Sequence, residues 1–228
     1  MRGTTRGVRV EVECPATSTA QLARKQAPGY YSCMSLEPTT KLDWDRLHAV
    51  AVSQEGYFTT EQAIDAGCSS QLLSEQIPVG RIERCWRLGI YRFADFPAGD
   101  HEDLVVGWLW SERAAVFSHQ TALARHELSD VLPARIYMTL PSEWRDRGLQ
   151  VHGEIIVHHD DVPLDDRVWF GPVPITSPRR TLEDCARGQL SPDLLRQAAR
   201  QALRRGLVVL EQLPEVEKAL APFGGIMG

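Results

Sequence analysis

The sequence predicts a mixed α+β protein of two domains: a winged helix-turn-helix domain over residues 42–93 and an α+β domain over residues 94–228, where helices flank antiparallel strands. Three observations support this. Two short helical patterns around Gly67 precede a hairpin pattern, Pro97 and Gly99 mark a linker, and strand patterns alternate with capped helices after it. At 228 residues and 43% apolar content, the chain can bury a proper core.

The helix-turn-helix pattern lies in residues 56–93. Thr59 or Thr60 can cap a first helix, Gly67 supplies the backbone freedom for a turn, and Ser69 can cap a second helix. Apolar residues recur at helical spacing in the second helix, which leaves a polar face that would meet base edges. A further helix, capped by Asp43 and running to about residue 54, precedes this pair.

Residues 81–93 form the predicted wing. Strand-forming residues bracket a turn at Leu88-Gly89, and four arginines stand among them against one acid, Glu83. Such a hairpin would lie along DNA phosphates. A small α-hairpin within a larger core also fits the two helices alone, and the basic hairpin favours the winged interpretation. The predicted DNA contacts are Thr59, Thr60, Ser69, Ser70, Gln71, Ser74, Arg81, Arg84, Arg87 and Arg92.

Composition limits the partners and the compartment. Residues 1–93 carry 11 Lys and Arg against 10 Asp and Glu, whereas residues 94–228 carry 14 against 20, so the second part is acidic. This balance argues against a protein that coats nucleic acid indiscriminately. The five cysteines are scattered without CxxC spacing, no run reaches membrane-spanning length, and no signal-peptide apolar region appears, which predicts a cytoplasmic protein with reduced thiols.

The N-terminal stretch, residues 1–41, has the composition of a disordered tail. Within it, Met34 begins a second ordinary opening, so translation from Met1 or from Met34 fits the sequence.

The second domain is predicted from caps and strand patterns. Helices are expected over residues 104–110 with Asp100 as the cap, from Ser118 to about 128, from Ser177 to about 188, from Ser191 to about 205, and over 210–220. Strands are expected over residues 136–140, in a hairpin of 149–151 with 154–158, and in a hairpin of 168–170 with 173–176.

Two groups of residues invite a catalytic interpretation. The cluster His152, His158, His159, Asp160 and Asp161 has no helical ligand spacing, so a polar strand end is expected rather than a metal site. Ser118 and His119 are adjacent at a helix start, where neighbouring side chains point apart, so Ser118 is expected to be a cap. No glycine-rich phosphate loop occurs. We therefore predict no catalysis, no metal, no cofactor and no small-molecule substrate.

A row of arginines in the acidic part is a stronger candidate for a functional site than these two groups. Arg196, Arg200 and Arg204 share one helix face, with Arg205 beside it. These four residues are the predicted partner-binding site for an anionic surface, either nucleic acid or an acidic protein. A solvated face without a partner is the alternative.

Several segments in this order resemble the AbiEi-type antitoxins of type IV toxin–antitoxin systems. The resemblance runs over nearly all of residues 44–208. It is carried by residues 56–63, 80–84 with 89–92, 117–123 with 128–133, 173–182 and 201–208. It implies a DNA-binding N-terminal domain that represses its own operon, and a C-terminal domain that counteracts a nucleotidyltransferase toxin directly or indirectly.

One departure from the family concerns the second helix of the pair. Similar proteins often carry Arg or Lys along it, whereas residues 70–77 contain neither and include Glu75. The wing arginines would then have to supply the ionic contacts to operator DNA. The leading hypothesis is an antitoxin and autorepressor. A stand-alone winged-helix regulator with a ligand-sensing or dimerising second domain is the alternative, and a nuclease-like enzyme comes third.

Overall fold

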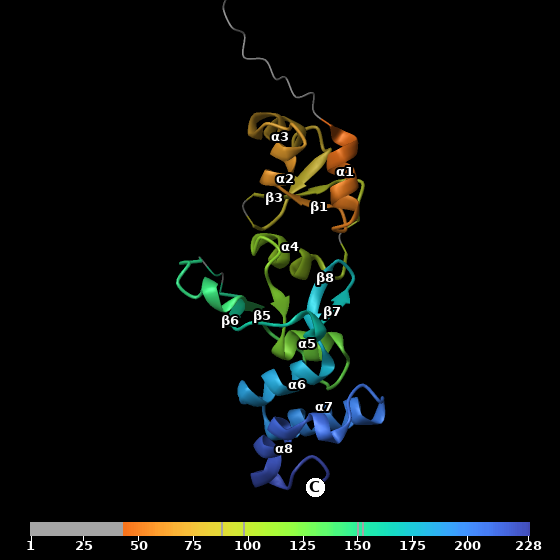
Figure 1. The fold of residues 1–228 in the computed structure, drawn as a ribbon. Helices are drawn as coiled ribbons and strands as arrows, with labels where there is room; N and C mark the ends of the chain where they lie inside the picture. Colours follow the sequence, from red (N-terminus) through yellow and green to blue (C-terminus); the bar gives the residue numbers. More distant parts are fainter. Residues whose placement is uncertain (1–42, 88, 98, 150, 152) are drawn as a thin grey trace, which may run out of the picture. The chain divides into compact units, whose positions relative to one another are not determined.

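The computed structural model describes residues 43–87, 89–97, 99–149, 151 and 153–228. These residues all belong to one compact unit, Thr39–Gly228. The predicted tail over residues 1–41, Leu88 of the predicted turn and His152 lie outside the described residues. The described chain is a mixed α+β structure with two sheets (Figure 1).

Five of the first six elements follow the predicted order, and the strand β1 (Tyr57–Thr59) was not predicted. The six are α1 (Trp44–Val52), β1, α2 (Thr60–Asp65), α3 (Ser70–Gln76), β2 (Ile82–Arg84) and β3 (Ile90–Phe93). The strands form an antiparallel sheet in the order β1-β3-β2.

The predicted caps of these helices are confirmed. Asp43 accepts a hydrogen bond from the Arg46 amide at 2.9 Å, and the Ser69 hydroxyl accepts one from the Leu72 amide at 3.2 Å. Gly67 has a φ of 85°, the left-handed conformation that a turn between α2 and α3 requires.

The small sheet buries both faces, because alternate residues of a strand point to opposite sides. On one side Phe58 and Phe93 join the N-terminal core, which consists of Leu47, Ala51, Phe58, Ala63, Ala66, Cys68, Leu73, Ile82 and Phe93. On the other side Tyr57 and Ile90 pack with α4 (Glu102–Trp110). The sheet is therefore held on both faces, which fixes the position of the β2–β3 hairpin.

The later strands form a second sheet. They are β4 (Val116–Phe117), β5 (Ile136–Leu140), β6 (Ile155–His159), β7 (Arg167–Phe170) and β8 (Val173–Thr176), in the order β6-β5-β4-β8-β7. The pairs β4–β5 and β7–β8 are antiparallel, whereas β4–β8 and β5–β6 are parallel. The predicted hairpin of β7 and β8 is confirmed.

Four further α-helices occur in the described chain. They are α5 (His119–Arg125), α6 (Pro178–Arg187), α7 (Pro192–Arg204) and α8 (Pro214–Leu220), with short 3-10 turns η1 (Ser142–Trp144), η2 (Leu164–Asp166), η3 (Leu210–Gln212) and η4 (Ala221–Phe223). Ser177 and Ser191 cap α6 and α7 as predicted, each followed by proline at the first helical position. None of the described helices is both long and apolar enough to cross a bilayer.

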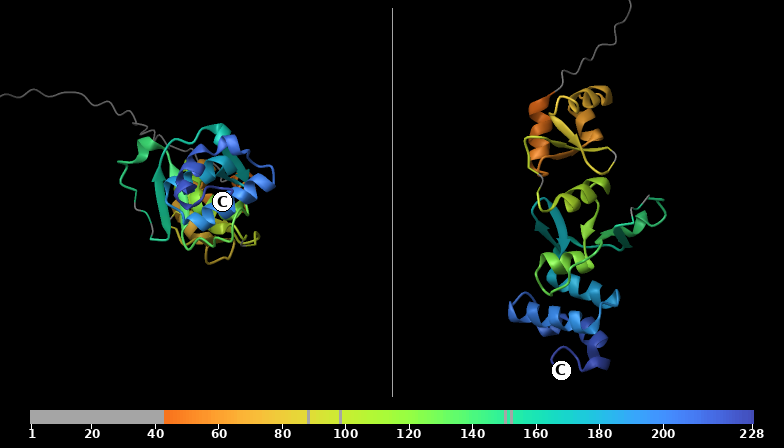
Figure 2. Two further views of the ribbon diagram at one scale, coloured as in Figure 1. Left: turned by 90° about the horizontal axis from the view of Figure 1, so that it is seen from below. Right: turned by 180° about the vertical axis from the view of Figure 1, so that it is seen from behind.

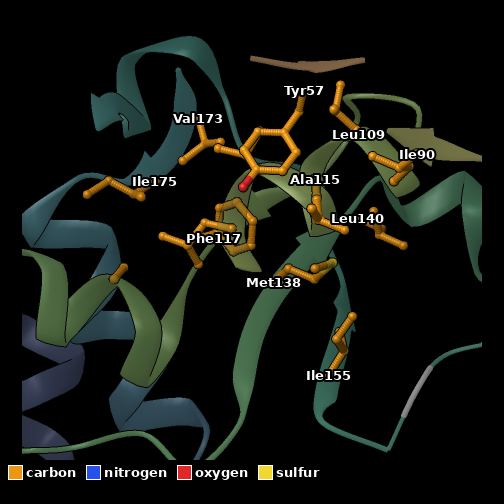
Figure 3. Packing of buried hydrophobic residues seen from close by; sticks show 14 residues of the cluster. Tyr57, Ile90, Leu109, Ala115, Phe117, Met138, Leu140, Ile155, Val173 and Ile175 are labelled. Atoms are coloured by element: carbon orange, nitrogen blue, oxygen red, sulfur yellow. The ribbon is translucent and has the colours of Figure 1, made fainter. Parts of the chain in front are cut away.

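Two further cores lie in this part of the chain. Figure 3 shows the central core, where Phe117, Met138 and Ile175 of the second sheet pack with Tyr57 and Leu109. Gly107 of α4 faces this core, and a Cβ there would approach the Met138 methyl at 3.2 Å. The C-terminal core joins α5 to α6, α7 and α8, the helices drawn in green and blue in Figure 2.

The second sheet is mixed, so the prediction of antiparallel strands was wrong for two of its pairings. The predicted hairpin of residues 149–151 with 154–158 is absent, since Leu149 and Val151 lie outside any strand and Ile155 pairs in parallel with Ile136. The reason is the long connection over residues 141–154, which returns the chain to the same end of the sheet before β6 begins.

Three helix boundaries also differ from the prediction. The helix α4 begins after His101, without a side-chain cap from Asp100. The helix α5 ends at Arg125 rather than at about residue 128, where Glu127 takes a positive φ of 56°. The predicted helix over 210–220 is broken before Pro214, which lacks the amide proton and starts α8 instead.

Candidate nucleic-acid interface

The exposed face of α3 carries the residues predicted to read bases. Ser70, Gln71 and Ser74 are exposed, while Leu73 between them is fully buried in the N-terminal core. The Gln71 amide donates to Glu75 at 3.3 Å, and the Ser74 hydroxyl donates to the Ser70 carbonyl at 3.0 Å. Gln71 keeps its carbonyl oxygen and one N–H for a base edge, since only one amide hydrogen is engaged.

The two predicted threonines have structural partners. Thr59 forms a capping box with Gln62, in which the Gln62 amide donates to the Thr59 hydroxyl at 3.2 Å and the Thr59 amide donates to the Gln62 side chain at 2.9 Å. The Thr60 hydroxyl donates to the Gly89 carbonyl at 3.2 Å. These residues therefore tie the start of α2 to the β2–β3 hairpin.

The four hairpin arginines (Arg81, Arg84, Arg87 and Arg92) fall into two pairs. Arg81 and Arg84 are exposed, and the Arg81 guanidinium lies over the Trp44 ring at 4.9 Å. Arg84, at the end of β2, forms no ion pair within the described residues. Both side chains are therefore open to solvent.

Arg87 and Arg92 are half-buried instead. Arg92 forms an ion pair with Glu83 at 2.5 Å on the sheet face that packs toward α4, and the hydrogen bond that Arg92 donates to Glu83 raises the pKa of Arg92. Arg87 lies over the ring of Trp110, the last residue of α4, at 4.4 Å, and burial lowers its pKa. The hairpin therefore offers two exposed cations rather than four.

The α7 arginines (Arg196, Arg200, Arg204 and Arg205) lie on one helix, as predicted, but three of them bind backbone carbonyls. Arg196 donates to Phe223 and Gly225, and Arg200 donates to Ile226 at 2.7 Å and Gly228 at 2.5 Å.

Arg205 donates to the carbonyls of His126 at 2.6 Å and Glu127 at 3.3 Å, just after α5. Arg204 is exposed and contacts Gln201 of its own helix at 2.5 Å. Arg196, Arg200 and Arg205 therefore link this helix to other segments of the chain, whereas the hydrogen bond of Arg204 stays within α7.

Ser118 and His119 differ from the prediction that they point apart. The Ser118 hydroxyl lies 2.9 Å from His119 Nδ1 and accepts a hydrogen bond from Thr139 at 2.8 Å. His119 has a φ of 51°, and this left-handed backbone turns the two side chains toward each other. Ser118 occupies the N-cap position of α5 without capping it.

The surroundings of His119 keep it neutral. It stacks on the His158 ring at 3.7 Å, and burial lowers its pKa to about 3. Thr139 donates to Ser118, so the Ser118 hydroxyl can in turn donate to Nδ1 when the imidazole proton is on Nε2. Ser118 is fully buried, so a substrate cannot reach its hydroxyl.

A buried arginine network beside this pair was missed in the sequence. Arg180 of α6 binds Asp184 at 2.8 Å and Asp160 at 2.5 Å, and Arg187 binds Asp184 at 3.0 Å. The spacing of four between Arg180 and Asp184 was a usable signal, but it did not indicate burial. Desolvation raises the pKa of Asp184.

The members of the strand-end cluster that the structure describes differ in burial: His158 is half-buried against the His119 ring, whereas Asp160 and Asp161 are exposed. Asp161 accepts two hydrogen bonds from Ser142, at 3.1 and 2.9 Å, and no group of three or more His, Cys, Asp and Glu suited to a metal occurs in the described part of the chain. The described cysteines, Cys68, Cys85 and Cys185, are free thiols. Burial raises the pKa of Cys85 to about 12, so this thiol is unreactive near neutral pH.

The chain can be compared with protein families, curated proteins and solved structures. No protein-family model matches the chain, and no curated protein matches it. Among solved structures, the crystal structure of the RV2827C protein from Mycobacterium tuberculosis is 16% identical with a TM-score of 0.42, and the match covers 78% of this chain and 80% of that one.

Proposed function

We propose that residues 43–93 form a winged helix-turn-helix domain that binds double-stranded DNA. The observation that carries this is the arrangement of α2 and α3 around Gly67 beside the β2–β3 hairpin. The order helix, strand, helix, helix, strand, strand, with a three-stranded antiparallel sheet, is that of a winged helix. The polar face of α3 and the exposed cations of the hairpin lie on neighbouring elements of this unit.

The two elements divide the work of DNA recognition in this proposal. Arg81 and Arg84 bind phosphates, which positions the protein without specifying sequence. Gln71 reads a base, because its remaining amide hydrogen and carbonyl oxygen match the edge of adenine in the major groove. The absence of Lys and Arg from α3 makes the hairpin the main source of ionic affinity.

We further propose that the chain is a cytoplasmic antitoxin and autorepressor of the AbiEi type, whose second domain counteracts a nucleotidyltransferase toxin. The support is the resemblance of its segments to that family. The exposed Arg204 is the member of the α7 arginines best placed to contact a partner.

A stand-alone regulator with a ligand-sensing second domain is the second candidate, and one feature favours it. A cavity of about 890 Å³ lies between α5, the loop over residues 129–135 and α7. Its lining includes Arg125, Arg135, Arg204 and Gln201. This volume is within the range of small-molecule sites.

The test of DNA binding uses the DNA immediately upstream of the chain's own reading frame. Fluorescence anisotropy with this duplex and with a shuffled duplex measures affinity and discrimination. Gln71→Ala should lose about 1–3 kcal/mol of discrimination with little change on shuffled DNA. Thr60→Ser, which keeps its hydroxyl, is the matched control. Equal wild-type affinity for both duplexes, or full discrimination in Gln71→Ala, contradicts the proposal.

Co-expression separates the two candidates for the whole chain. An antitoxin protects cells from the nucleotidyltransferase encoded beside it, whereas a stand-alone regulator does not. Protection should persist in Gln71→Ala, because that residue belongs to the DNA-binding part. Loss of repression without loss of protection supports the antitoxin and autorepressor, and failure of the wild-type chain to protect supports the regulator.

A further inference from the structure

Arg87 lies at the tip of the hairpin but is held by the part of the chain that follows it. Its guanidinium is 4.4 Å from the Trp110 ring centre and 5.3 Å from that of Trp86. Its Nε and Nη2 atoms are buried and have no hydrogen-bond partner within the described residues. Two of the three guanidinium nitrogens are therefore closed to a phosphate unless the side chain moves.

We infer that Trp110 is an autoinhibitory contact, which withholds Arg87 from DNA and so restrains binding by the hairpin. This inference rests on the proposed DNA-binding function. It adds a coupling between the hairpin and α4, because Trp110 ends α4 and packs against the central core.

The other hairpin arginines show that the restraint is particular to Arg87. Arg81 and Arg84 are exposed, and the ring partner of Arg81 is Trp44 of α1 rather than a residue of α4. Arg92 has its own acid, Glu83, opposite it in the strand register. Arg92 also has one buried donor without a partner in the described residues, Nη1, but its ring contact is with Tyr57 of β1. Arg87 combines two such donors with an aromatic partner from α4.

The held position is easily reversed. A cation over an aromatic ring is weakly stabilised, and burying N–H groups without acceptors opposes that gain. Phosphate oxygens would satisfy the same donors with charge-assisted hydrogen bonds. DNA and Trp110 therefore compete for one guanidinium, and by linkage DNA binding weakens the contact of the hairpin with α4.

The affinity of the full chain for its upstream duplex tests the inference. Trp110→Leu removes the aromatic face and keeps an apolar side chain, and it should tighten binding about two- to fivefold, the low end of the range for a cation–π contact. Trp110→Phe, which keeps a ring, should bind like the wild type. Trp169→Leu is the matched control, because Trp169 is 68% exposed and contacts Trp108 rather than an arginine.

The double variant Arg87→Ala with Trp110→Leu shows whether the effect passes through Arg87. The gain from Trp110→Leu should vanish in the Arg87→Ala background. Circular-dichroism melts accompany each variant, and Trp110→Met replaces Trp110→Leu if the latter melts early. Unchanged affinity in a folded Trp110 variant, or a gain that persists without Arg87, overturns the inference while leaving the proposed function standing. Absence of DNA binding by every folded variant overturns the proposed function and the inference with it.

Discussion

The hairpin arginines and the α7 arginines look alike in the sequence but have different partners in the structure. Arg81 and Arg84 are exposed just before and at the end of β2 in a short hairpin. Arg196, Arg200 and Arg205 instead reach carbonyls of the 223–228 segment and of the chain after α5. Backbone carbonyls at helix ends lack internal partners, and an arginine of another element can satisfy them. A row of cations is therefore available to a partner only where its own chain offers no acceptors.

Arg180 of the α6 network is more buried than the arginines of either of these two groups. Arg180 is 8% exposed and bridges Asp160 and Asp184. Arg180→Ala leaves Asp184 buried without its main cation, which should cost about 3–5 kcal/mol of unfolding free energy. Chemical denaturation measures this, with Arg84→Ala as the matched exposed control. A loss below that of an ordinary surface substitution would show that the network adds nothing to stability.

Substitutions of the α7 arginines should differ in their effect on the unfolding free energy. Arg200→Ala removes two hydrogen bonds to the 223–228 segment and should lower the unfolding free energy by about 1.5–3 kcal/mol. Arg204→Ala, one turn away on the same face, should change it by less than about 0.5 kcal/mol. Thermal melts of the pair provide the comparison. Equal melting temperatures of the two variants would show that the hydrogen bonds of Arg200 do not stabilise the fold.

The caps show what the sequence could predict. Asp43, Thr59, Ser69, Ser177 and Ser191 occupy cap positions as expected, because a cap depends on a few adjacent residues. The parallel pairing of β5 with β6 depends on where a long connection returns the chain, which no local pattern records.

The candidate site was predictable only in part, for the same reason. The exposed face of α3 followed from periodicity. The docking of Arg87 on Trp110 joins residues of different elements, and the engagement of Arg196 and Arg200 depends on how the 223–228 segment lies against α7. The Ser118–His119 contact depends on a left-handed φ that is uncommon for histidine.

Lowering the pH should destabilise the buried region around His119, whereas the arginines stay charged. The folded pKa of His119 is about 3, below its ordinary value of 6.5, so the unfolded chain binds more protons between these two values. Stability is therefore full above about pH 6.5 and falls as the pH decreases, by about 1 kcal/mol between pH 6 and pH 5. Denaturation of the wild type and His119→Gln at several pH values measures it. A wild-type slope that His119→Gln leaves unchanged would assign the pH dependence to other groups.

The salt dependence of DNA binding by Arg84→Ala and Arg204→Ala tests the central claim most directly. Both arginines are exposed, one on the hairpin and one on α7, so the two substitutions remove the same charge from different surfaces. We expect Arg84→Ala to reduce the slope of log affinity against log salt by about 1, since one phosphate contact is lost. Arg204→Ala should leave the slope at the wild-type value. An unchanged slope in Arg84→Ala, or an equal loss in both variants, would contradict a hairpin that binds DNA through its exposed arginines.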